Sequence, residues 1–154
     1  MARARKRHTR RKPAASRRPA PARAPRTTAA EAQLLRLARD LTGLPLASAL
    51  EKLAAAWAPG APLPRDVAKA FLQSRGDKTA ALALAWAREQ VRLALEETVA
   101  AAPRRERRRI EADPDTLAWL LVAACESIAH EPPSAVADRV RAILELSAHG
   151  GTAG

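Results

Sequence analysis

The residues best suited to chemistry in this chain are basic side chains concentrated near its N-terminus. Residues 1–26 hold 11 of the 27 Arg and Lys residues and no acidic residue, so the other 16 basic residues balance the 16 acidic ones. A block of cations can neutralise the phosphates of DNA or RNA and release their counterions. A solvated tail in an Arg- and Ala-biased chain is the alternative. We predict phosphate contacts from Arg3, Arg5, Lys6, Arg7, Arg10, Arg11, Lys12, Arg17 and Arg18.

A second basic run occupies residues 104–109, where five of six residues are Arg. This run could form another phosphate contact. It could equally be a solvated turn, because Glu106, Glu111, Asp113 and Asp115 supply compensating negative charge nearby. The sequence leaves both interpretations open.

No group of residues has the spacing of a catalytic site. Glu96 and Glu97 are neighbours, and on a helix their side chains would diverge by about 100°. Cys125 lies in an apolar run without a nearby base, which is typical of a buried, inert thiol. The three His residues have no partner at metal-ligand spacing, and no Gly-rich phosphate loop is present. We therefore predict that the protein is not an enzyme and has no metal or cofactor.

The elements that carry these residues are predicted to be helices. Ala and Leu are abundant, aromatic residues make up 3% of the chain, and Tyr is absent, which favours helices over sheets. Thr28 and Glu31 have the spacing of a capping box, and Gly43 would end that helix. Pro-containing breaks then predict helices from Pro45 and over 64–74, followed by a long helix over 77–101. We expect an all-α bundle of about six helices with a disordered basic tail.

Side-chain periodicity predicts which faces of these helices are buried. On the third helix we expect Val67 and Phe71 to point inward. On the long helix, Leu84, Val91, Leu95 and Val99 form a core stripe. Leu82, Trp86 and Leu93 are expected to widen that stripe.

The C-terminal part of the sequence predicts two helices joined by a short Pro-containing turn. Asp113 and Pro114 are a helix start, and the helix that follows is apolar on several sides. A chain of 154 residues can hardly bury such a helix by itself, so we predict a homodimer. The predicted dimer-interface residues are Leu117, Leu120, Leu121, Ala124, Ile128, Val136, Val140, Ile143 and Leu144. Trp86 and Trp119 could line a cavity among the helices for a small apolar effector, although core packing is the simpler interpretation.

The order of elements resembles the TetR-type bacterial transcriptional regulators. The likeness is best in the C-terminal segments Asp113–Ala124, Ile128–His130 and Ala135–Val140, and in Asp77-Lys78 ahead of Ala80-Ala81-Leu82. The resemblance implies a helix-turn-helix DNA-binding part, an effector pocket and a four-helix dimer interface. Residues 28–76 match only in helix order, so no base-reading residue is assigned there.

The expected organisation is a cationic tail over 1–27, three short helices over 28–76, and a long helix plus hairpin over 77–148. The partners we expect are DNA or RNA, bound through the tail, and a second copy of the chain. Two other functions stay open: an RNA- or ribosome-associated protein using the same tail, and a helical module that binds another protein. The longest apolar run, Leu117–Cys125, is too short to span a bilayer. The single cysteine agrees with a reducing cytoplasm, where we expect the protein to reside.

Overall fold

Capping interactions start the helices where the sequence predicts them. The computed structural model describes residues 27–102 and 112–148, and these form six α-helices, one short 3₁₀ helix and no strand. Helix α1 (Ala29–Leu41) begins with a full capping box, in which Thr28 and Glu31 exchange two hydrogen bonds of 3.2 Å. Helix α4 (Lys78–Ala101) begins at Asp77, whose carboxylate accepts the backbone N–H of Ala80 at 3.0 Å.

The helices between α1 and α4 are bounded by Pro and Gly. Helix α2 (Leu46–Ala56) follows Pro45, and helix α3 (Pro62–Gln73) starts with a Pro at its first position, two residues earlier than predicted. Gly43 and Gly76 follow α1 and α3 with positive φ values of 78° and 87°, the left-handed conformation that favours Gly after a helix. Pro and Gly residues near the helix ends therefore set these boundaries.

The C-terminal hairpin has the predicted form. Helix α5 (Pro114–Ser127) continues into a 3₁₀ turn, η2 (Ile128–His130), and helix α6 (Pro133–Ala148) returns beside it. The Asp113 carboxylate accepts both the backbone N–H and the hydroxyl of Thr116, at 3.0 and 2.7 Å. The prediction of an all-α fold is thus confirmed for the described residues. None of the helices in this part of the chain is long and apolar enough to cross a bilayer.

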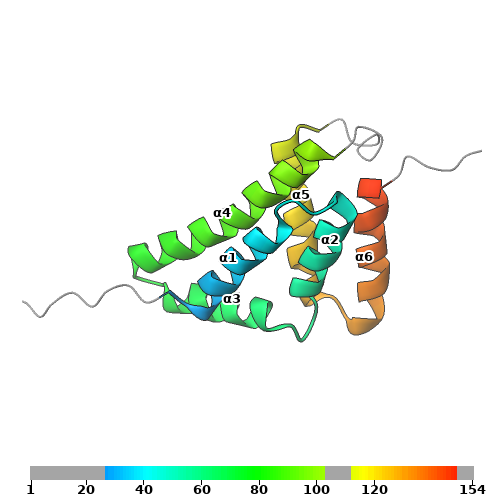
Figure 1. The fold of residues 1–154 in the computed structure, drawn as a ribbon. Coiled ribbons are helices and arrows are strands. Elements are labelled where there is room, and N and C mark those ends of the chain that lie inside the picture. The colour runs from blue at the N-terminus through cyan, green and yellow to red at the C-terminus, as the bar shows by residue number, and fades with distance from the viewer. Residues whose placement is uncertain (1–26, 103–111, 149–154) are drawn as a thin grey trace, which may run out of the picture.

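A single hydrophobic core joins all six helices. Helix α1 packs mainly on α4, α4 also packs on α5, and α2 packs on α5 and α6 (Figure 1). Helix α3 lies against α1. The most deeply buried large side chains come from both halves of the chain and include Leu34, Leu50, Leu95 and Ile128. The core is therefore continuous across residues 76–77, where the sequence suggested a change of region.

Several side chains predicted to point inward are exposed, although Val67 of α3 is partly buried against the core as predicted. Phe71 is 59% exposed, and Leu63 and Ala70 are buried in its place on α3. On α4 the stripe from Leu84 to Val99 is buried as predicted, but Leu82, Trp86 and Leu93 are 69%, 56% and 38% exposed and do not widen it. These three residues lie on the opposite side of the helix, because 100° of rotation per residue puts them across from positions 84 and 91.

Candidate nucleic-acid interface

The basic segment joins the helical body beside α3 and the start of α4. Thr27 and Thr28, the first described residues, line a surface hollow of about 260 Å³ together with Lys69 and Gln73 of α3. They also line a second hollow of about 320 Å³ with Asp77 and Ala80. The segment 1–26 therefore meets the body where these two hollows adjoin.

The exposed face of α3 next to this junction is basic. Arg65 and Lys69 are exposed at an i, i+4 spacing, and Arg75 follows the end of the helix. The Arg75 guanidinium lies 6.0 Å from the centre of the Phe71 ring, a cation–π distance that fixes the charge over an exposed aromatic surface. Sequence reasoning did not single out these cations, although the four-residue spacing of Arg65 and Lys69 is the signal that could have found them.

The nearby acidic groups are already engaged. The Asp66 carboxylate accepts a hydrogen bond of 2.7 Å from the Gln33 side chain and pairs with Arg65 at 3.3 Å. The hydrogen bond from Gln33 is the main cause that lowers the pKa of Asp66. Asp77 caps α4. These carboxylates act within the fold, whereas Lys69, Arg75 and Lys78 are exposed and form no ion pair within the described residues.

The nine residues predicted to contact phosphate lie outside the described residues. These are Arg3, Arg5, Lys6, Arg7, Arg10, Arg11, Lys12, Arg17 and Arg18. The Arg-rich run 104–109 is also outside them. Their contacts with nucleic acid remain predictions.

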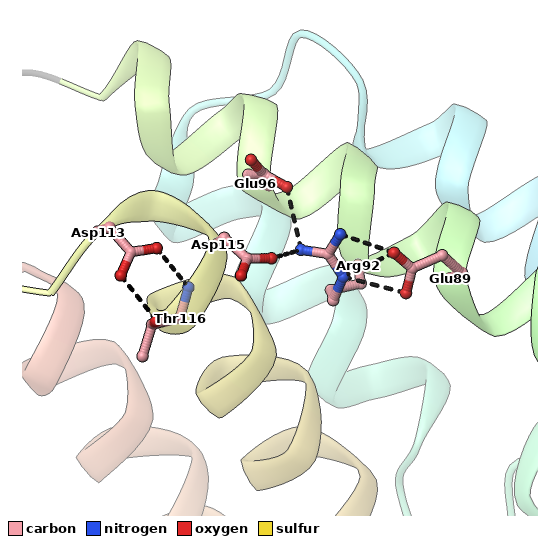
Figure 2. Close-up of polar contacts among 6 residues, drawn as sticks. All are labelled: Glu89, Arg92, Glu96, Asp113, Asp115 and Thr116. Carbon is pink, nitrogen blue, oxygen red and sulfur yellow. Dashed lines mark hydrogen bonds and ion pairs between the residues drawn. The ribbon is translucent and has the colours of Figure 1, made fainter.

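Other charged side chains join α4 to α5 and leave little free positive charge there. Figure 2 shows Arg92 of α4 among Glu89, Glu96 and Asp115, with Glu89 at 2.6 Å and Glu96 at 3.0 Å. The carboxylates raise the pKa of Arg92, the hydrogen bond that Arg92 donates to Glu89 contributing most, and Arg92 in turn lowers the pKa of Glu89. Arg88 pairs in the same way with Glu126. This cluster fixes how α5 sits against α4.

The predicted dimer-interface residues are divided between the core and the surface. Leu117, Leu121, Ile128 and Ile143 are buried within the single chain. Ala124, Val136, Val140 and Leu144 are partly buried and pack against the same core, whereas Leu120 is exposed. Most of the apolar area of the hairpin is thus used inside one chain. The homodimer itself remains a prediction.

Trp86 and Trp119 lie on the surface and not around an interior cavity, since both are more than half exposed. Trp119 lines an open hollow of about 230 Å³ with Ala85, Arg88 and Glu89 of α4. Trp86 is not part of that hollow. The third tryptophan, Trp57, is buried in the core.

No protein-family model matches this sequence, and no curated protein and no solved structure matches it either.

The described residues offer no metal-binding cluster of three or more His, Cys, Asp or Glu side chains. The thiol of Cys125 is fully buried, as predicted, and burial raises its pKa to about 12. A thiol with this pKa stays protonated at neutral pH and is a weak nucleophile. Among the described residues, the basic surface at the start of the helical body is the feature best suited to bind phosphate.

Proposed function

We propose that the protein is a DNA-binding regulator of TetR-like organisation, which holds duplex DNA mainly through the cationic segment 1–26. The observation that carries this proposal is the segregation of charge. The whole net charge of +11 belongs to those 26 residues, and the rest of the chain is neutral. Such a block attracts a polyanion strongly but reads no base sequence.

The helical body adds exposed cations next to Thr27, where the cationic segment ends. Lys69 lines the same hollow as Thr27 and Thr28, and Arg75 is exposed just after the end of α3. Phosphates held by the segment near this junction would lie within reach of both cations. The contacts to DNA would then run from the segment onto α3.

The test is an anisotropy titration of labelled duplex DNA with the full chain at several salt concentrations. In the test variant, the seven basic residues of positions 3–12 are replaced by Gln. Because each lost phosphate contact reduces the slope of log K against log salt by about 0.9, we expect the slope to fall by roughly six. Binding to unrelated DNA sequences should weaken to the same extent.

Two further variants locate the contribution of the body. Lys69→Gln with Arg75→Gln should weaken binding and reduce the slope by about two. The matched control replaces two exposed cations of α6, Arg139→Gln with Arg141→Gln, and should leave binding unchanged. An unaltered salt slope in the seven-residue variant would refute the role of the segment. Stronger binding to single-stranded RNA than to duplex DNA would favour the RNA-associated alternative.

A further inference from the structure

An exposed apolar stripe runs along the outer face of α4. Leu82, Trp86 and Leu93 are 69%, 56% and 38% exposed, and the described helices pack on the other side of α4. Figure 1 shows α4 along one edge of the bundle, with α1 on its inner side. Trp119 of α5 flanks this stripe in the hollow that it shares with Ala85 and Glu89. An apolar patch of this kind on a soluble helix is typical of an interaction surface.

Charged residues extend the stripe at both ends and in its middle. In order along α4 the stripe reads Lys78, Leu82, Trp86, Glu89, Leu93 and Glu97. All six side chains fall within about 100° of the helix circumference. Lys78 and Glu97 are exposed, and neither pairs with a charge in the part of the chain that the structure describes.

The spacing of this stripe is the same in both directions. Its residues follow one another at intervals of four, four, three, four and four positions. When two such helices pack antiparallel about a two-fold axis midway between Trp86 and Glu89, each position meets its mirror position. Leu82 then faces Leu93 of the second copy, and Lys78 faces Glu97 of the second copy.

The charges select this orientation. Antiparallel packing gives two Lys78–Glu97 attractions. It also sets the indole N–H of Trp86 opposite the Glu89 carboxylate, which accepts hydrogen bonds from Arg92 and has lone pairs for one more. Parallel packing would instead bring Lys78 against Lys78, Glu89 against Glu89 and Glu97 against Glu97. Lys78 also stands at the first position of α4, where the helix dipole disfavours a cation. The position of this Lys therefore does not serve the stability of its own helix.

We infer that the outer face of α4 binds a second copy of this chain, as an antiparallel two-fold pair centred between Trp86 and Glu89. This interface differs from the hairpin interface that the sequence suggested. The residues that define it all belong to α4, so its test needs no DNA.

The first experiment measures the mass of the full chain by sedimentation over a range of concentrations. We expect a monomer–dimer equilibrium. Trp86→Ala should raise the dimer dissociation constant at least about tenfold, since buried Trp residues dominate most interfaces. The matched control is Phe71→Ala, which removes an equally exposed aromatic side chain from α3.

Charge reversal tests the orientation. Lys78→Glu and Glu97→Lys should each raise the dissociation constant about tenfold, because two attractions become repulsions. An equimolar mixture of the two variants should form a one-to-one heterodimer, and the variant with both changes should regain the original affinity. Glu51→Lys on α2 is the control for a reversed surface charge.

Loss of structure cannot imitate these results. Lys78→Glu places an acid at the N-terminus of α4, and Glu97→Lys places a base near its C-terminus, and both changes favour the helix. A chain that stays monomeric at all concentrations would overturn the inference. A dimer unaffected by Trp86→Ala, or single reversals that do not recover when mixed, would also overturn it.

Discussion

Neighbouring residues of α3 have opposite environments because each step along an α-helix turns the side chain by about 100°. Ala70 is buried, whereas Phe71 is exposed and lies under the Arg75 guanidinium. Because Phe71 is the larger apolar side chain, the sequence favours it for the core. The small Ala takes the inward position, which lets α3 approach α1 closely.

A carboxylate that accepts hydrogen bonds in the folded state should make the stability of the protein depend on pH. The backbone N–H and hydroxyl of Thr116 lower the pKa of Asp113 below its ordinary value of 3.8. The ionised form is thus favoured in the folded state, so its contribution to stability is present above pH 3.8 and is lost as pH falls toward the lower folded pKa.

We therefore expect Asp113→Asn to be less stable than the original chain at pH 7, with the difference shrinking as pH falls below about 4. Urea unfolding at several pH values measures this difference. Leu72→Ala, a change to an exposed side chain that does not titrate, should show no such convergence. A constant difference across this range would contradict the assignment.

At the scale of elements, α4 organises the molecule because it offers a different surface on each side. Its inner face meets α1, one flank meets α5 through the Arg88 and Arg92 ion pairs, and its outer face carries the exposed stripe. Apolar residues on nearly every side of this helix explain why the sequence pattern was ambiguous. The ion pairs supply an orientation that apolar packing does not specify.

The two faces of α4 should respond differently to the same chemical change. Leu95→Ala removes a fully buried side chain and should cost about 2–5 kcal/mol of unfolding free energy. Leu82→Ala removes an exposed side chain and should change it by about 0.5 kcal/mol or less. Urea unfolding at a concentration where the chain is monomeric measures both. Similar losses from the two variants would mean that α4 is rotated from the described orientation.

At the scale of the whole molecule, the continuous core should make unfolding cooperative. Helices of 28–76 pack directly on helices of 77–148, as α1 does on α4 and α2 on α6. Neither part buries its apolar face without the other. Small domains with one core usually unfold in a single transition.

We expect urea unfolding curves from far-UV circular dichroism and from tryptophan fluorescence to coincide. Leu50→Ala, a change in the buried part of α2, should shift both midpoints together by the same amount. Leu72→Ala, which shortens an exposed side chain of α3, is the control and should shift neither. Two separated transitions would show that the parts fold independently.

The sequence by itself determined the helices, their starting caps and the segregation of charge. Capping boxes, Pro at first helical positions and Gly after helix ends act within a few residues, so they can be read along the chain. The cationic segment and the absence of catalytic spacing are also properties of residue order. The phosphate contacts predicted for the cationic segment rest on residue order alone.

Only the tertiary structure decided which apolar residues are buried. The helices over 78–101 and 114–127 have more apolar residues than one face can hold, so periodicity offers several orientations of similar hydrophobicity. The choice depends on where the neighbouring helices lie. Packing among the helices buries Leu95 of α4 and Leu121 of α5, and leaves Trp86 and Trp119 at the surface. Whether a side chain is buried depends on which helices pack together. The periodicity of a single helix carries no information about its neighbours.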